Sequence, residues 1–195
     1  MAFIANTMFE TKVTNAVFDE TLNVSGKYQS SAADADCSAG LLCVRASLLP
    51  NEGYTSVYNT NAYIFNAAED TDYDGIYACN TFNVQEAATG SGNIYKVGAE
   101  TLGLGLFAGE VGTFTKIDFD NKSIYRFGAG NLSTAISTNT FFTVDNGLLV
   151  PAATAPANAG TPYFKLIASG TATAGAYAAM TYYDVMACRD VVVAS

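Results

Sequence analysis

The chain has 195 residues, of which 50% are hydrophobic and only 14% are charged, whereas roughly 25% of the residues in an ordinary globular domain are charged. With 9 Lys and Arg residues against 18 Asp and Glu residues, its formal charge is −9, which repels phosphate backbones and argues against direct binding to nucleic acid. Histidine is absent, so the most common general base near neutral pH is missing.

Residues 1–38 are expected to form an N-terminal arm ahead of the main domain. Between residues 7 and 22, apolar side chains recur at intervals of three and four, and Thr7 with Glu10 has the sequence pattern of a capping box. We therefore predict a short amphipathic helix at residues 7–22, which packs either on its own domain or on a neighbouring subunit. The Ser-, Ala- and Asp-rich run at residues 30–38 predicts a loop.

Residues 39–195 are predicted to form one β domain. Turn signals rich in Gly, Pro, Asn and Asp recur about every eight to twelve residues, which is the spacing of a sandwich or a barrel. The sequence therefore predicts an all-β, sandwich or barrel-like module of about ten short strands. In chain order, the expected strands are residues 40–48, 57–65, 76–80, 101–107, 113–119, 123–127, the two halves of 141–151, 163–168, 176–186 and 191–193.

Two hairpins are predicted within this domain. In residues 141–151, Asn146 and Gly147 form the strongest short-range hairpin signal, because both central residues of a type I′ turn need positive φ. The second predicted hairpin joins residues 113–119 to residues 123–127.

No targeting or membrane segment is apparent in the sequence. No apolar run approaches the roughly 20 residues of a membrane-spanning helix, and residues 1–6 lack the basic start of a signal peptide. We therefore expect a protein that is made in the cytoplasm and does not bind a membrane.

The four cysteines, Cys37, Cys43, Cys79 and Cys188, have no C-x-x-C spacing, so the sequence gives little support to a zinc site. Their neighbours are apolar, which favours buried free thiols. A disulfide between Cys37 and Cys43 is the main alternative, because a short strand and a turn could bring them together.

The acidic run at residues 70–75 resembles the first half of a calcium loop. Asp70, Asp72 and Asp74 alternate, and Gly75 permits a sharp turn. However, Thr81 stands at the twelfth position, where such a loop carries a bidentate Glu. A solvated acidic turn is therefore favoured, and calcium binding stays open.

No constellation of residues identifies an enzyme. Asp118 and Asp184 could be a pair of carboxylates for glycoside cleavage, but both lie in predicted strands, where one charged side chain facing solvent is the ordinary outcome. The glycine runs 103–105 and 128–130 lack the continuation of a phosphate loop. We therefore assign no catalytic, cofactor-binding or metal-binding residue, and we expect a protein that is not an enzyme.

Several short apolar and glycine motifs together resemble the decoration, or cement, proteins of tailed-bacteriophage heads. These motifs are residues 39–45, 75–80, 128–131 and 141–151. The resemblance implies a virion protein with a β body on the outside of an icosahedral capsid and an arm or rim that contacts the major capsid protein. The resemblance assigns no individual contact residue. Independently of it, the low content of charged residues suits a protein that is packed among copies, either on a shell or as a homo-oligomer.

Two other functions remain as alternatives. One is another virion structural subunit, such as a tail-tube or head-fibre protein. The other is a carbohydrate-binding module or adhesin, for which the 12 Tyr and 12 Phe residues would supply an aromatic binding face.

Overall fold

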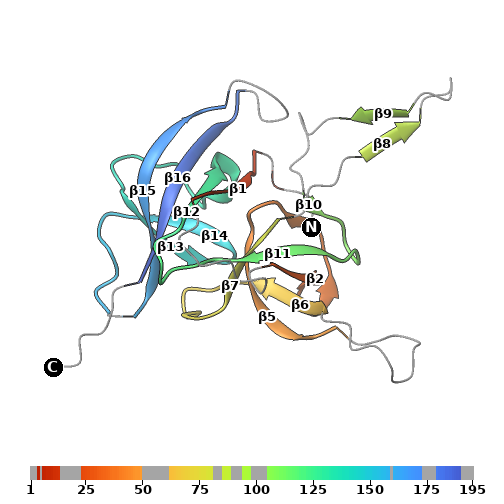
Figure 1. The fold of residues 1–195 in the computed structure, drawn as a ribbon, viewed down its shortest axis with the longest axis horizontal. Helices are drawn as coiled ribbons and strands as arrows, with labels where there is room; N and C mark the ends of the chain where they lie inside the picture. Colours follow the sequence, from red (N-terminus) through yellow and green to blue (C-terminus); the bar gives the residue numbers. More distant parts are fainter. Residues whose placement is uncertain are drawn as a thin grey trace.

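A computed structural model describes residues 4, 6–13, 23–49, 62–80, 85–88, 94–97, 105–158, 160–172 and 179–189. These residues form sixteen β-strands and one short 3-10 helix, η2 (Ala129–Asn131), with no α-helix among them. The predicted all-β class is confirmed, and the two largest sheets pack together as a sandwich-like module (Figure 1).

One large sheet, which we call the six-stranded sheet, is antiparallel and has the strand order β1-β12-β16-β15-β13-β14. The predicted hairpin at residues 141–151 is confirmed as β13 and β14, and its turn residues Asn146 and Gly147 have φ values of 48° and 74°. The strands of this sheet are β1 (Phe9–Val13), β12 (Ile124–Gly128), β13 (Phe141–Asp145), β14 (Leu148–Ala152), β15 (Pro162–Thr171) and β16 (Thr181–Arg189).

The other large sheet closes into a small barrel. Its strand order is β11-β7-β5-β6-β2-β3, and β2 pairs with β11 as well as with β6, so five of the strands form a ring. All pairs in the ring are antiparallel except β2 with β6. The strands are β2 (Asn23–Ser30), β3 (Ala33–Asp34), β5 (Leu42–Leu48), β6 (Ala62–Ala67), β7 (Ile76–Cys79) and β11 (Gly112–Lys116).

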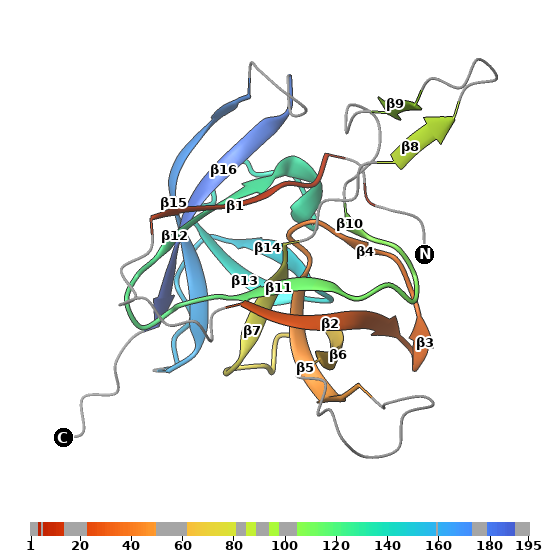
Figure 2. The same ribbon diagram turned by 45° about the vertical axis from the view of Figure 1, so that its right-hand side comes forward.

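Two short ribbons complete the described structure. The strands β4 (Cys37–Ser38) and β10 (Gly105–Leu106) pair beside the barrel, whereas β8 (Gln85–Ala88) and β9 (Ile94–Val97) pair only with each other. Figures 1 and 2 both draw the β8–β9 ribbon apart from the two large sheets.

The strands β5 and β7 separate two hydrophobic cores. In β5, Leu42 packs into the core beneath the six-stranded sheet, and its neighbour Cys43 packs inside the barrel. In β7, Ile76 and Ala78 face the sheet, whereas Tyr77 and Cys79 face the barrel interior. Because successive side chains of a strand point to opposite sides, a wall between two cores must be apolar at consecutive positions.

Aromatic rings fill the barrel. Phe65 and Phe114 stack with their centroids 4.0 Å apart, and Tyr77 meets Phe65 edge-on at 5.3 Å. A Cβ atom at Gly26 would lie 2.4 Å from the Phe65 ring, so this position of β2 has room only for glycine. The rings therefore fix how closely β2 approaches the other strands.

The predicted helix at residues 7–22 is wrong where the structure describes it. Phe9–Val13 is the edge strand β1, which pairs with β12, and residues 14–22 lie outside the described residues. Only Phe9 of β1 is buried, so the spacing of apolar residues there does not mark a buried helix face. The predicted arm, residues 1–38, contributes β1 to the six-stranded sheet and β2 to the barrel.

Two further local predictions are corrected. The predicted loop at residues 30–38 contains the short strands β3 and β4. The strands β11 and β12 do not form a hairpin, because β11 belongs to the barrel and β12 to the six-stranded sheet. Parts of other expected strands, including residues 57–61, 101–104 and 191–193, lie outside the described residues.

The Phe65 ring is expected to be a major contributor to stability. The substitution Phe65→Ala should lower the free energy of unfolding by about 3–5 kcal/mol, because it removes a fully buried ring and leaves a cavity. Urea denaturation measures this change. The control Leu48→Ala, at a side chain that is 61% exposed, should change it by less than about 0.5 kcal/mol. Equal effects of the two substitutions would contradict the described core.

Candidate functional site

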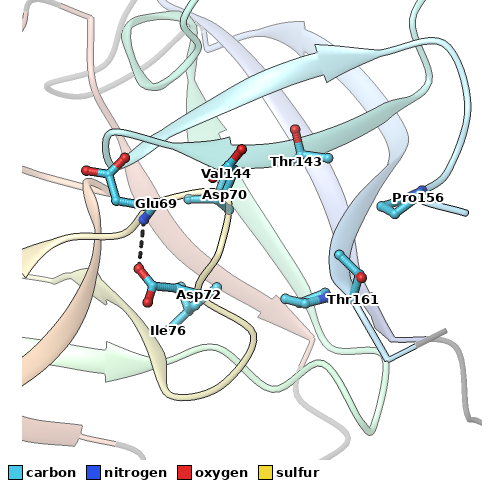
Figure 3. Close-up of a pocket in the computed structure, with 9 residues that line it drawn as sticks. Glu69, Asp70, Asp72, Ile76, Thr143, Val144, Pro156 and Thr161 are labelled. Atoms are coloured by element: carbon cyan, nitrogen blue, oxygen red, sulfur yellow. Dashed lines mark hydrogen bonds between the residues drawn. The ribbon is translucent and has the colours of Figure 1, made fainter. Parts of the chain in front are cut away.

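A pocket of about 240 Å³ lies between the loop after β6 and the strand β13 (Figure 3). Its lining includes the carboxylates of Glu69, Asp70 and Asp72 together with Thr143 and Thr161. Two of these acids already accept local hydrogen bonds. The backbone N–H of Asn146 donates to Glu69 Oε2 at 3.2 Å, and the backbone N–H of Glu69 donates to Asp72 Oδ2 at 2.8 Å. These bonds hold the loop in shape and join it to the β13–β14 turn.

The aspartates of the calcium-like motif do not share a partner. Asp72 caps the Glu69 N–H, and Asp74 forms an ion pair with Arg189 Nη1 at 2.8 Å. Within the described part of the chain, no group of three or more His, Cys, Asp or Glu residues is placed to hold a metal ion. Asp70, Asp72 and Asp74 are therefore not brought together as a set of ligands.

Asp118 and Asp184 also have separate sets of partners. Asp184, on β16, accepts two hydrogen bonds from Arg126, at 2.7 Å from Nε and 2.8 Å from Nη2. Asp118 lies in the loop after β11, where it accepts hydrogen bonds from Asn121 and from the Ser123 hydroxyl. Each carboxylate stabilises its own segment of the fold.

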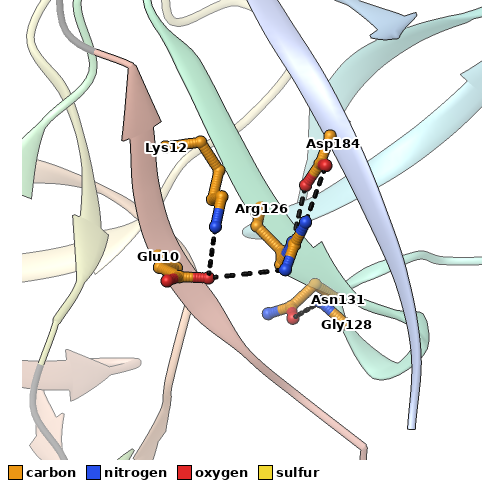
Figure 4. A network of polar contacts seen from close by, with 6 residues as sticks. All are labelled: Glu10, Lys12, Arg126, Gly128, Asn131 and Asp184. Carbon is orange, nitrogen blue, oxygen red and sulfur yellow. Dashed lines mark hydrogen bonds and ion pairs between the residues drawn. The ribbon is translucent and has the colours of Figure 1, made fainter. Parts of the chain in front are cut away.

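Arg126 is the centre of a polar network on the six-stranded sheet (Figure 4). Besides Asp184, its guanidinium lies 3.7 Å from Glu10 Oε2 and 3.7 Å from the centroid of the Tyr182 ring. Lys12 Nζ lies 3.4 Å from the same Glu10 oxygen. The hydrogen bonds to Asp184 raise the pKa of Arg126, so the guanidinium stays charged and joins β1, β12 and β16.

Asn131 is a buried polar residue that links distant segments of the chain. Its Oδ1 accepts the backbone N–H of Met8 at 2.9 Å and that of Gly128 at 3.0 Å, and its Nδ2 donates to the backbone O of Ala39 at 2.8 Å. At Gly40, beside this contact, φ is +74° and a Cβ atom would lie 2.7 Å from Asn131 Nδ2. Asn131 therefore satisfies backbone groups of the segments that lead into β1, η2 and β5.

All four cysteines are buried free thiols, and no disulfide joins Cys37 to Cys43. Cys37, Cys43 and Cys79 belong to the barrel core, where the Cys79 thiol lies 3.8 Å from the backbone O of Cys37. Burial raises the pKa of Cys37 and of Cys43, which keeps both in the less reactive thiol form.

A line of largely apolar side chains crosses the outer face of the six-stranded sheet, and we call it the outer row. Strand registers place its members opposite one another, and the next residues along the strands, Tyr125 and Val185, point into the core. Residues opposed in antiparallel strands share a face of the sheet. The outer row consists of Val13, Ile124, Met186, Lys165, Phe141 and Ala152.

Comparison with protein-family models, with curated proteins and with solved structures finds no match to this chain. No helix among the described residues is long and apolar enough to cross a membrane. The surfaces and polar networks described above are therefore the basis for a functional proposal.

The hydrogen bonds of Asn131 predict a large effect of its removal. Asn131→Leu should lower the free energy of unfolding by about 2–5 kcal/mol, because the Met8 N–H and the Ala39 carbonyl lose their buried partner. Chemical denaturation followed by circular dichroism measures the loss. The control Asn158→Leu, at an exposed loop residue, should stay within about 0.5 kcal/mol of the wild type. A stable Asn131→Leu variant would refute the importance of this contact.

The buried tyrosines predict a loss of stability at alkaline pH. Burial raises the pKa of Tyr28, Tyr77 and Tyr125 above the ordinary value of 10.0, so the folded state holds protons that the unfolded chain releases. Their contribution is complete below pH 10.0 and is lost as the pH rises through the higher folded-state pKa values. The urea midpoint should therefore fall as the pH rises above about 10, and less steeply for Tyr28→Phe. A midpoint that rises over this range would contradict the expectation.

Proposed function

We propose that this chain is a non-enzymatic virion structural protein that decorates and stabilises the outside of a tailed-phage capsid by binding major capsid subunits. The resemblance of its motifs to decoration proteins suggests this role, and the observation that carries the proposal is the low content of charged residues. Only 14% of the residues are charged, which agrees with a protein that is packed among other subunits.

The polar networks of the described residues support a structural role over a catalytic one. Arg126 holds Asp184, Arg189 holds Asp74, and Asn121 with Ser123 holds Asp118. A carboxylate that serves as a general acid or base must instead be free to exchange a proton with a substrate. The carboxylates of Asp74, Asp118 and Asp184 are engaged in maintaining the fold.

The mechanism that we propose is stabilisation by mass action. A protein that binds the assembled shell and not its separated subunits stabilises the shell by its own binding free energy, repeated at every site. Because the chain has a formal charge of −9, its docking surface on the capsid should be neutral or basic.

A carbohydrate-binding function is the rival from another class. Binding a sugar commonly requires several aromatic rings on an exposed face. Among the described residues, Tyr73 is the aromatic side chain that is largely exposed, at 47%, and the other large exposed apolar side chains are aliphatic. This distribution favours a structural role.

Co-sedimentation with phage heads tests the proposal. The purified chain should bind undecorated heads, built from the major capsid protein encoded beside it, until it reaches a fixed ratio to the shell protein. It should also shift the heat-induced rupture of those heads to a higher temperature, because it binds the intact shell preferentially.

Heads that are already decorated serve as the control and should take up little additional protein. Failure to bind undecorated heads would refute the decoration function. Formation of rings or fibres by the isolated chain would then support a tail-tube or head-fibre subunit, whereas retention on a glycan array would support the carbohydrate-binding alternative.

A further inference from the structure

The outer row extends across every strand of the six-stranded sheet. Val13 on β1 pairs with Ile124 on β12, and Ile124 pairs with Met186 on β16. The row continues from Met186 to Lys165 on β15. From there it passes through Phe141 on β13 to Ala152 on β14. It therefore reaches from one edge of the sheet to the other.

The row is accessible to solvent and contains one charge. Val13 is 45% exposed, Ile124, Met186 and Phe141 are partly exposed, and Lys165 is exposed. Lys165 forms no ion pair with any of the described residues, whereas Arg126 and Arg189 both do. A partner for this face must therefore offer apolar side chains and a carboxylate near Lys165.

A second copy of the same chain satisfies both requirements. When two sheets meet face to face about a two-fold axis that runs parallel to the strands between β15 and β16, each row meets the other in reverse order. Val13 then faces Ala152 of the other copy, Ile124 faces Phe141, and Met186 faces Lys165. Apolar side chains thus meet apolar side chains at the outer positions, and no charge faces a like charge.

This arrangement also supplies the carboxylate. Asp184 lies two residues from Met186 on β16 and on the same face of the sheet, which is a separation of about 6.6 Å along the strand. Lys165 of the opposite copy, placed over Met186, can extend its long side chain to this Asp184. The two oxygens of Asp184 bind Arg126, and each retains a lone pair for a second donor.

We propose that the outer row is a symmetric interface at which two copies of this chain associate through their six-stranded sheets. The inference adds a specific contact between copies to the proposed multi-copy virion protein. It does not require that the other partner be a capsid, and it is tested without phage heads, so the two proposals can fail independently.

A charge-complementation experiment with the full chain tests this interface. Ile124→Lys and Phe141→Glu each place a charge opposite an apolar side chain of the other copy, and each should raise the dissociation constant of the dimer about tenfold or more. Ile124 and Phe141 lie three strands apart in one copy, or about 14 Å, so they do not pair within a chain. Mixing the two variants should restore a dimer, because the new ammonium and carboxylate groups then meet across the interface.

The readout is the mass of the protein by sedimentation velocity over a series of concentrations. The wild-type chain and the mixture should approach twice the 20.4 kDa of one chain, and each variant alone should remain near that mass. Val111→Lys is the matched control, because Val111 is 53% exposed and lies outside the outer row, and it should dimerise like the wild type. Circular dichroism verifies the fold of every variant.

If either variant fails to fold, Val13→Lys and Ala152→Glu provide a second complementary pair at the two ends of the row. A wild-type chain that stays monomeric at every concentration would overturn the proposal. A dimer that both variants leave unchanged would also overturn it, and so would two monomeric variants that fail to associate when mixed.

Discussion

The burial of β7 and of the start of β5 on both faces is the constraint on which the rest of the structure depends. Leu42, Ile76 and Ala78 face the core beneath the six-stranded sheet, while Cys43 and Tyr77 face the barrel interior. A charged side chain at any of these positions would lose its hydration without gaining a partner. The two layers therefore share one wall, which must be apolar at consecutive positions.

Polar contacts then fix how the layers are joined. Asn131 forms hydrogen bonds with the backbone of Met8 before β1, of Ala39 before β5 and of Gly128 at the end of β12. Gly147 of the β13–β14 turn accepts a hydrogen bond from Leu42 at 2.9 Å and donates one to Ala68 at 2.8 Å, so the tip of this hairpin is bound to the barrel. Hydrogen bonds are directional, whereas hydrophobic contacts are not, so these few contacts select one orientation of the sheet on the barrel.

The sequence was sufficient to predict features that depend on neighbouring residues. The Asn146–Gly147 turn and the apolar runs of β5 and β7 are local, and they led to the correct fold class. The errors arose where a distant partner decides the structure. The strand β1 exists because β12 pairs with it, and β11 and β12 separate because each finds its partner in a different sheet. The sequence likewise gave no sign of the Asn131 contacts, since Met8 and Ala39 are far from Asn131 along the chain. The sequence shows that Asp118 and Asp184 are charged, but it does not show that Arg126 on another strand binds Asp184 or that Ser123 binds Asp118.

The pairing of the first strands with late ones also has a consequence for synthesis. Phe9 pairs with Phe127, so β1 leaves the ribosome long before its partner β12 is made. The strand β2 can pair early with β3 and β6, but its other neighbour, β11, is made much later. The strand β16, the last in the described chain, lies inside the six-stranded sheet between β12 and β15. Contacts between such distant residues form slowly, and unpaired strand edges promote aggregation. The nascent chain therefore carries β1 unpaired until β12 has been made, and the six-stranded sheet can close only after β16 has left the ribosome.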